Sequence, residues 1–450
     1  MAQPSSRPRD SLIQGLGPFS TTALVAGNMI GSGIFIVPAA LADVAGPVAL
    51  LAWGLVAAGF LCLVAVYADL AGAYPISGGL QVYAQRAFGD FTGLEVAFLY
   101  WASVVIANAA YMTAFVSYFA EFVPASRSPA VAFVVAQALL WTLALINVLG
   151  VRLGGIVQIV TTILKIAPLL VLSVALLASG SPSNLVPFAP KGFAALLPAS
   201  SFIAWLFLGS ESATIPAEEV RGGAPTIRRS AYSGFALAAA VYALLALSVT
   251  LGAPASAIVG DASPLATLAR RTLGAGGGVF ISLGALVSIA GILNGSLLIA
   301  GRLPFAAARQ GIAPSFLGRI DARTGTPLVS LVACGVVSAV LVSLYFSRSL
   351  LETYNLIALA STCAALVAIA VTCAAHVVLA RRDPERFAPS RRGRGRLAAV
   401  VGLVLVLFMI AGAGWTVAAL TAIVIVLPIP YYFLGVRRRR GAAAPAGGAG

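Results

Sequence analysis

Apolar stretches of about 18 residues or more recur along this chain from Leu16 to Leu434, with short polar loops between them. A stretch of that length can cross the hydrocarbon core of a bilayer as a helix. Only 9% of the 450 residues are charged, whereas about 25% of the residues of a soluble domain are charged. The pattern therefore predicts an all-α integral membrane protein that lies in the lipid bilayer and has no soluble domain.

We expect twelve transmembrane helices. Their approximate bounds are 17–41, 46–71, 92–122, 130–150, 154–178, 196–217, 230–252, 276–303, 327–347, 352–380, 397–412 and 415–435. The first ten residues are polar and no cleavable apolar region follows them, so the first apolar segment is interpreted as a span and not as a signal peptide. A short amphipathic helix is expected on the cytoplasmic surface between spans 2 and 3, and an external loop at "GAGGG", 274–278.

The basic residues indicate the orientation. With the N-terminus inside, 22 of the 28 lysines and arginines fall in cytoplasmic segments. By the positive-inside rule both termini then face the cytoplasm, and the expected location is the cytoplasmic (inner) membrane. The formal net charge of +14 is thus a topology signal, and nucleic acid is not an expected partner.

Two spans carry residues that weaken helices. Span 1 contains "GNMIGSGIFIVPAAL" from Gly27, and span 6 contains "LFLGSESATIPAEEV" from Leu206. Unwound backbone persists in a membrane only where it is buried in protein or lines a cavity. Two discontinuous spans five apart are typical of transporters built from inverted repeats, here spans 1–5 and spans 6–10. The alternative for span 1 is close helix packing, because "GNMIG" also fits the GxxxG pattern.

The resulting division has five parts. It comprises a cytoplasmic N-terminal tail (1–14), a first inverted repeat (15–180), a second inverted repeat (196–380), spans 11 and 12 (397–436), and a basic, disordered cytoplasmic tail (437–450). Four cysteines without CxxC spacing and a single histidine, His376, give no disulfide framework, metal site or cofactor site to expect. The sequence offers no combination of a nucleophile with a general base, so an enzyme is not expected.

Five ordered motifs resemble the amino acid/polyamine/organocation (APC) superfamily of transporters. They are "GNMIGSGIFIVPA", "YADLAGAYPISGGLQVYAQRAFG", "LYWASVVIANAAYM", "FLGSESATIPAEEVRGGAPTIRRS" and "AGRLPFAAARQGIAPSFLGRIDARTGTP". The resemblance covers about Gly15 to Leu434. It implies the five-plus-five inverted-repeat, LeuT-like fold with discontinuous spans 1 and 6, alternating access, and an amino-acid-like substrate.

The expected substrate site lies between the two broken spans. A half-helix starting after Gly33 would aim amide N–H groups at a carboxylate, and carbonyls at the break in span 6 would suit an ammonium group. The candidate substrate-binding residues are Asn28, Gly31, Ser32, Gly33, Asn108, Trp205, Leu208, Gly209, Ser296 and Ser361. For Asn108 and Ser296 the alternative is hydrogen bonding between helices, and for Trp205 a lipid-facing place at the interface.

Two ionisable residues are candidates for proton coupling. Lys165 is the one cation deep within a predicted span, where an ammonium is costly to bury, and Glu211 adjoins the break in span 6. Carbonyls near Gly27 to Ser32 would favour the protonated lysine, so protonation could tie span 1 to span 5. The alternatives are a permanently charged Lys165 that joins spans or extends to the surface, and a Glu211 that binds the substrate ammonium or only the loose backbone of the break.

Two branches of the superfamily remain open. In resemblance to proton-coupled amino acid permeases, Lys165 matches a fifth-span lysine that occupies the place of sodium in sodium-coupled relatives. The chain also resembles arginine/agmatine and lysine/cadaverine exchangers. There Trp205 matches a tryptophan that stacks on the substrate side chain, and Glu211 matches a glutamate implicated in proton sensing. Ser296 stands where the arginine/agmatine exchanger has a second substrate-facing tryptophan. We therefore expect a sodium-independent, proton-coupled amino acid transporter (a symporter), with an amino acid/amine exchanger (an antiporter) as the alternative and the oligomeric state open.

Overall fold

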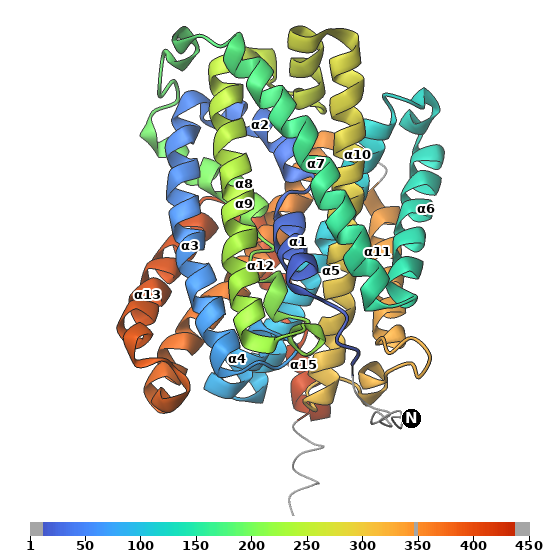
Figure 1. Ribbon diagram of the computed structural model, residues 1–450, viewed down its shortest axis with the longest axis vertical. Helices are drawn as coiled ribbons and strands as arrows, with labels where there is room; N and C mark the ends of the chain where they lie inside the picture. Colours follow the sequence, from blue (N-terminus) through green and yellow to red (C-terminus); the bar gives the residue numbers. More distant parts are fainter. Residues whose placement is uncertain (1–11, 346–349, 437–450) are drawn as a thin grey trace, which may run out of the picture.

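The computed structural model describes residues 12–345 and 350–436. Over these ranges the chain is helical, and its only strand-like feature is an isolated bridge between Leu16 and Val220. The α-helices, many of them labelled in Figure 1, are α1 (Pro18–Met29), α2 (Gly33–Val44), α3 (Ala49–Ala73), α4 (Leu80–Phe88), α5 (Asp90–Phe119), α6 (Pro129–Val148), α7 (Val151–Ala178), α8 (Leu196–Phe207), α9 (Gly223–Gly252), α10 (Pro264–Arg309), α11 (Leu328–Tyr345), α12 (Leu350–Arg382), α13 (Pro389–Ala411), α14 (Trp415–Val426) and α15 (Ile429–Tyr431).

Eleven segments of the described chain are long and apolar enough to span a membrane, and a shorter apolar helix covers Leu328–Ser343. Each of the twelve predicted spans coincides with one of these segments. The chain is therefore a multi-pass, all-helical membrane protein. The predicted tail at 437–450 and most of the predicted tail at 1–14 lie outside the described residues.

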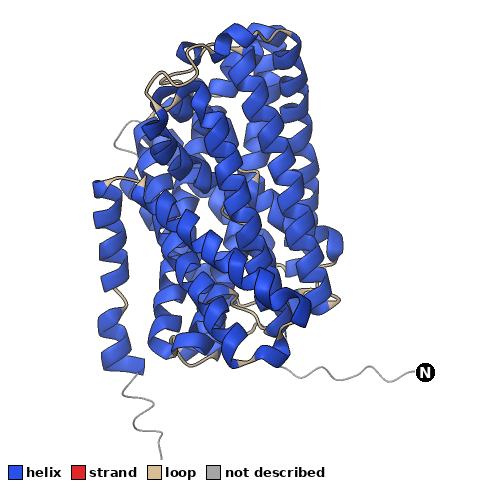
Figure 2. Ribbon diagram, turned by 90° about the vertical axis from the view of Figure 1, so that its left-hand side faces the viewer, coloured by secondary structure: helices blue, strands red, loops and turns tan. Residues whose placement is uncertain are grey.

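The first span is the most enclosed segment and the last one stands at the edge. Within the first span, Pro18–Val44, 94% of the most apolar 18-residue window is buried. The corresponding share in the last span, Trp415–Val436, is 17%. α1 packs against α9 and α7 near the middle of the bundle (Figure 1), while the helix that leads into the C-terminal grey trace stands beside the bundle in Figure 2. The first span contains the glycine- and serine-rich break, and its burial shields that irregular backbone from lipid.

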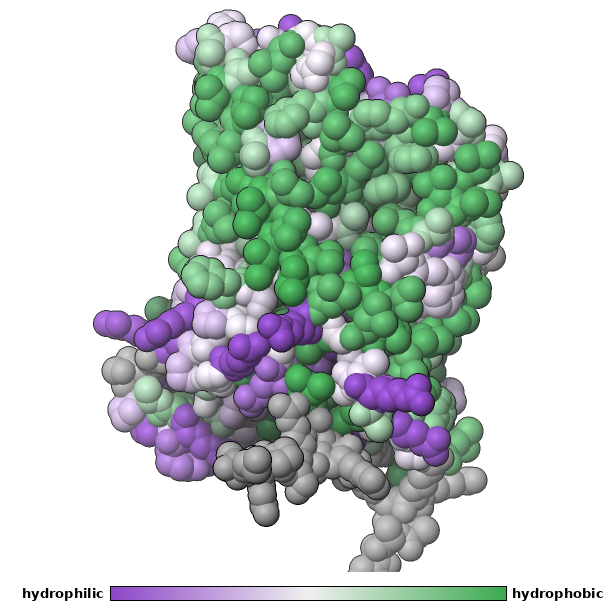
Figure 3. Space-filling model, turned by 45° about the vertical axis from the view of Figure 1, so that its right-hand side comes forward, coloured by the Kyte–Doolittle hydropathy of each residue, from purple (hydrophilic) through white to green (hydrophobic). Residues whose placement is uncertain are grey.

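A broad apolar surface covers most of the face shown in Figure 3, and polar residues gather toward its lower end. Large aliphatic side chains of several helices point outward, among them Val134, Ile163, Val174 and Val404. Such a surface would be an aggregation liability in water, but it suits contact with lipid acyl chains.

Two segments between spans differ in part from expectation. α4 forms where the amphipathic helix is predicted, although its first five residues, Leu80 to Ala84, are buried. The loop expected at 274–278 is confined to a sharp kink at Gly274 (φ 76°), where two helical stretches of α10 meet, while 275–278 are helical. The reason is close packing, because a Cβ atom at Gly277 would lie 2.8 Å from the Ala269 carbonyl oxygen, so the glycines let the chain fold back on itself.

Candidate functional site

The break in span 1 separates α1 from α2 at residues Ile30 to Ser32. Interrupting a helix leaves carbonyls without intrahelical donors. The buried Lys165 ammonium of α7 donates to the carbonyl oxygens of Gly27 at 2.9 Å and Ile30 at 2.7 Å, and the Ser288 hydroxyl of α10 lies 3.2 Å from the Ile30 oxygen. One cationic side chain therefore supplies donors to two of the carbonyls at the break.

The break in span 6 begins where α8 ends at Phe207. Leu208 is extended, Gly209 has a φ of +104°, and a short 3-10 turn follows at Ser212–Thr214. A Cβ atom on Gly209 would lie 2.8 to 2.9 Å from the Cβ, carbonyl carbon and carbonyl oxygen of Asn28, so the two broken spans touch there. The Asn28 amide also donates to the Ser212 hydroxyl at 2.9 Å.

A central cavity lies beside these two breaks. Seven of the predicted site residues line it, namely Asn28, Trp205, Leu208, Gly209, Glu211, Ser296 and Ser361. Side chains that the sequence did not single out complete the wall, including Tyr100, Tyr111 and Ile292. The Tyr111 and Trp205 rings pack with centroids 5.5 Å apart. The cavity is thus built from spans 1, 3, 6, 8 and 10.

Glu211 is fully buried and already well supplied with hydrogen-bond donors. The Tyr100 hydroxyl and the Gly209 amide N–H donate to its Oε1, the latter at 3.1 Å, and the Ser210 hydroxyl lies 3.2 Å from its Oε2. This carboxyl therefore holds the backbone of the break and anchors Tyr100 from the neighbouring span. Its predicted roles in proton coupling and in binding the substrate ammonium stay predictions.

The other predicted residues lie around the cavity rather than on its wall. Asn108 bridges α10 and α11, accepting from the Ser296 hydroxyl at 2.6 Å and donating to the Ser338 hydroxyl at 3.0 Å. Gly31, Ser32 and Gly33 are buried but do not line the cavity.

The reason is that neighbouring side chains occupy the space beside two of these residues. A Cβ atom on Gly31 would lie 2.1 Å from the Ile292 Cδ1, and one on Gly33 would lie 2.9 Å from the Trp205 Cδ1. Both positions need glycine for close packing, and the start of α2 is covered in this conformation.

Several residues of this site escaped sequence reasoning. Tyr242 of α9 brings its hydroxyl within hydrogen-bonding reach of the carbonyls of Met29 and Leu206, and so joins the two breaks. Gln158 of α7 approaches Gly27 so closely that a Cβ there would lie 2.1 Å from its Nε2. Neither residue belongs to a distinctive motif, so only the packing of α7 and α9 on α1 reveals them.

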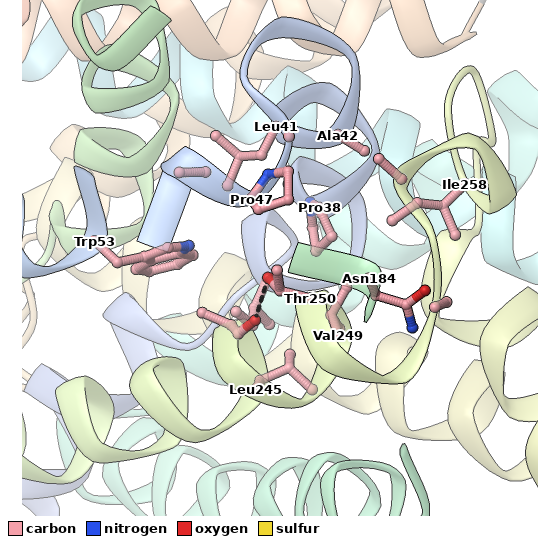
Figure 4. Close-up of a pocket in the computed structure, with 16 residues that line it drawn as sticks. Pro38, Leu41, Ala42, Pro47, Trp53, Asn184, Leu245, Val249, Thr250 and Ile258 are labelled. Carbon is pink, nitrogen blue, oxygen red and sulfur yellow. Dashed lines mark hydrogen bonds between the residues drawn. The ribbon is translucent and has the colours of Figure 1, made fainter. Parts of the chain in front are cut away.

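A second pocket lies at the far end of α2, between α2, α3, α9 and the loop that carries Asn184 (Figure 4). Its wall is largely apolar, with Pro38, Leu41 and Trp53 among its residues. Its polar side chains are engaged, since Asn184 donates to the Leu251 carbonyl and Thr250 to the Ala246 carbonyl, each at 2.7 Å. The central cavity, with a carboxyl and several hydroxyls, is therefore the better candidate for a polar ligand.

The opposite end of span 6 is closed by a buried ion pair. Arg302 of α10 donates from Nε and Nη2 to the two carboxylate oxygens of Glu219 at 3.1 and 3.0 Å, and both side chains are fully buried. The main chain of Glu219 also accepts from the Leu16 amide at 3.0 Å. Bidentate geometry with no water contact makes this the strongest link between α10 and the segment after the break.

Replacing Arg302 with methionine is expected to destabilise the protein strongly, by about 3–5 kcal/mol, because it leaves the Glu219 carboxylate buried and unpaired. The double variant Arg302→Met/Glu219→Gln is expected to recover much of that loss. Thermal unfolding in detergent, monitored by size-exclusion chromatography, measures both, with Arg319→Met in an exposed loop as the control. A single variant as stable as the parent would contradict this account of the pair.

Within the described ranges, no three or more His, Cys, Asp and Glu side chains are grouped so as to hold a metal ion. His376, the one histidine, lies near the Asp69 carboxylate, with 3.7 Å between Nε2 and Oδ2.

The sequence was compared with known proteins. Residues 16–434 match the family model for amino acid permeases. A putative arginine/ornithine antiporter of Bacillus subtilis is 26% identical over 382 residues, which cover 77% of this chain and 80% of that protein. A cadaverine/lysine antiporter of Escherichia coli is 27% identical over 332 residues (71% and 72%), and an L-lysine transport protein of Corynebacterium glutamicum is 26% identical over 339 residues (73% and 68%).

Proposed function

The chain belongs to the amino acid permease family, and on that premise we propose that it is a secondary active transporter that moves amino acids across the cytoplasmic membrane by alternating access, coupled to protons and independent of sodium. In this proposal the twelve spans form a LeuT-like fold, with inverted repeats at 15–180 and 196–380 and both termini in the cytoplasm. Spans 11 and 12 (397–436) stand outside the repeats. The substrate occupies the central cavity between spans 1 and 6.

The observation that carries the proposal is the contact of Lys165 with the break in span 1. Its ammonium donates to the Gly27 and Ile30 carbonyls. If the lysine lost its proton and turned away, both carbonyls would lose this donor, and Ile30 would keep only the Ser288 hydroxyl. An ammonium shielded from water is also costly to maintain. Proton gain and loss at Lys165 would therefore strengthen and weaken the attachment of α7 to the broken span, and so bias which side of the cavity opens.

An α-amino acid fits the cavity as follows. Its carboxylate would approach the N-terminus of α2 at Gly31, Ser32 and Gly33 once Ile292 and Trp205 move aside, since that end of a helix attracts anions. Its ammonium would face carbonyls at the C-terminus of α8 and the amide oxygen of Asn28, which has no hydrogen-bond partner. The side chain would extend toward Asn108, Ser296 and Ser361.

The second candidate is an exchanger of an amino acid for an amine. It is favoured by the names of the relatives, several of which are antiporters of cationic amino acids, and by the placement of Trp205 and Glu211 on the cavity wall. It is weakened by Ser296, which supplies no aromatic surface for a long cationic side chain. In the exchanger, Glu211 and not Lys165 would be the group that responds to protons.

Uptake of a radiolabelled amino acid panel into proteoliposomes separates the two candidates. The vesicles are prepared with the lumen empty or loaded with unlabelled amino acid, with sodium replaced by choline throughout, and an inward proton gradient is imposed. Concentrative uptake into empty vesicles that collapses on addition of a protonophore is the expected result. Uptake that requires a loaded lumen and ignores the gradient would instead establish the exchanger.

A further inference from the structure

Three arginines surround Tyr74 at the end of the bundle where α3 and α12 finish. The guanidinium carbons of Arg86 and Arg386 lie 5.0 and 5.2 Å from the centre of the Tyr74 ring. The Tyr74 hydroxyl donates to Asp383 at 2.5 Å, and Arg382 lies 3.6 Å from the other oxygen of that carboxylate while donating to the Arg86 carbonyl at 2.7 Å. We call these five residues the arginine cluster.

The arginine cluster carries an excess of positive charge. It contains three guanidinium groups and one carboxylate, and all three arginine side chains are exposed. The hydrogen bond from Tyr74 and the adjacent arginines hold the pKa of Asp383 below its usual range, so this carboxylate stays ionised but is already engaged. Burial, together with the hydrogen bond to Asp383, raises the pKa of Tyr74 to about 12, so the phenol stays neutral. Arg86 and Arg386 thus have no carboxylate of their own in the cluster.

The cluster adjoins the start of α13, a helix whose outward side is apolar. Phe387 packs edge-on against Tyr74, with ring centroids 6.3 Å apart, and its carbonyl accepts from Arg392 at 3.1 Å in the first turn of α13. Further along α13 the side chains turn outward and are apolar, with exposed fractions of 65% at Leu397, 52% at Val400 and 61% at Val404. Basic groups therefore lie at one end of an apolar, outward-facing stripe.

We propose that the arginine cluster binds the phosphate headgroup of an anionic phospholipid whose acyl chains lie along this stripe of α13. Guanidinium groups pair with phosphate through parallel hydrogen bonds, and basic residues next to a membrane-spanning helix attract anionic lipids. The apolar stripe on α13 identifies the occupant as a lipid and not as a soluble phosphate, because a soluble anion would gain nothing from it.

Lipid binding at this place bears on the broken span. Arg86 lies in the last turn of α4. The segment just before α4 holds the inner end of span 6, because the Gly78 amide donates to the Ile215 carbonyl at 2.9 Å and the Glu218 amide to the Ser77 hydroxyl at 3.1 Å. A headgroup that fixes Arg86 and Arg386 together would hold α4 against the turn that follows α12 and stabilise the closed inner end.

Lipid-dependent thermal unfolding tests the proposal on the full-length protein in detergent. Phosphatidylglycerol is added to one sample, phosphatidylcholine to a second and glycerol 3-phosphate to a third. In the parent protein, the midpoint temperature of thermal unfolding is expected to rise with phosphatidylglycerol and not with the other two additives. Native mass spectrometry is expected to show phosphatidylglycerol that remains bound to the protein. An equal rise with phosphatidylcholine would overturn the role of charge, and an equal rise with glycerol 3-phosphate would overturn the lipid as occupant.

Charge-matched variants locate the site. Arg86→Gln/Arg386→Gln is expected to lose both the midpoint shift and the retained lipid, while Arg319→Gln/Arg323→Gln, in an exposed loop, is expected to keep both. If the first variant does not fold, Arg386→Gln alone replaces it. A cluster variant that responds like the parent would overturn the proposal. Because the readouts need no transport, they are independent of the proposed function.

Discussion

Replacement of Lys165 by alanine is expected to abolish the acid stimulation of amino acid uptake and to lower the rate of uptake at least tenfold. The variant loses two charge-assisted hydrogen bonds, to the Gly27 and Ile30 carbonyls, each worth about 1.5–3 kcal/mol, and about 1.4 kcal/mol corresponds to a factor of ten. It also loses the proposed proton-carrying group. Initial rates of uptake into proteoliposomes between pH 5 and pH 8 measure both effects.

Thr162→Val is the matched control for Lys165→Ala. Thr162 lies one turn earlier on α7, and its hydroxyl donates to the Ala23 carbonyl of α1 at 3.3 Å, so this variant also loses a link between the two helices but no titratable group. It is expected to keep the acid stimulation at a reduced rate. Undiminished acid stimulation in Lys165→Ala would refute proton coupling through this lysine.

Replacement of Gly209 by alanine is expected to eliminate substrate binding. A side chain at φ +104° costs about 1–2 kcal/mol in backbone strain, and the added Cβ would lie 2.9 Å from backbone atoms of Asn28, which cannot move without displacing the break in span 1. The two broken spans would be forced apart at the cavity wall. Saturation binding of the radiolabelled substrate to detergent-solubilised protein measures the loss.

Gly192→Ala is the control that separates the effect of backbone strain from the effect of the contact with Asn28. Gly192 also has a positive φ, +73°, but nothing lies within 4 Å of its added Cβ. This variant is expected to bind substrate like the parent, with only a slightly lower thermal midpoint. Normal affinity in Gly209→Ala would mean that the contact between the two breaks is unrelated to the substrate site.

The breaks and the Lys165 contact followed from local chemistry. Glycine, serine and proline within an apolar run mark the positions where a membrane helix is interrupted, and the interruption at Ile30 to Ser32 falls inside the quoted motif of span 1. The carbonyls freed there are acceptors, and Lys165 is the one cation within a neighbouring predicted span. The sequence therefore contained both partners of that contact.

Other features depend on how the helices are rotated, which the sequence pattern of an almost uniformly apolar span does not specify. Arg302 sits in a motif that was interpreted only as a family signature, and its pairing with Glu219 required the C-terminal ends of α10 and span 6 to meet. Ile292 packs over Gly31 and Trp205 packs over Gly33, and these contacts likewise depend on how the helices pack.

Direct detection of proton movement with the substrate tests the central claim. Proteoliposomes that contain a pH-sensitive dye in the lumen, without sodium and with the membrane potential clamped, are given an external amino acid identified from the uptake panel. We expect acidification of the lumen that begins with substrate addition and is missing in vesicles that contain the Lys165→Ala variant. Entry of radiolabelled amino acid at the normal rate with no change in lumenal pH would contradict it.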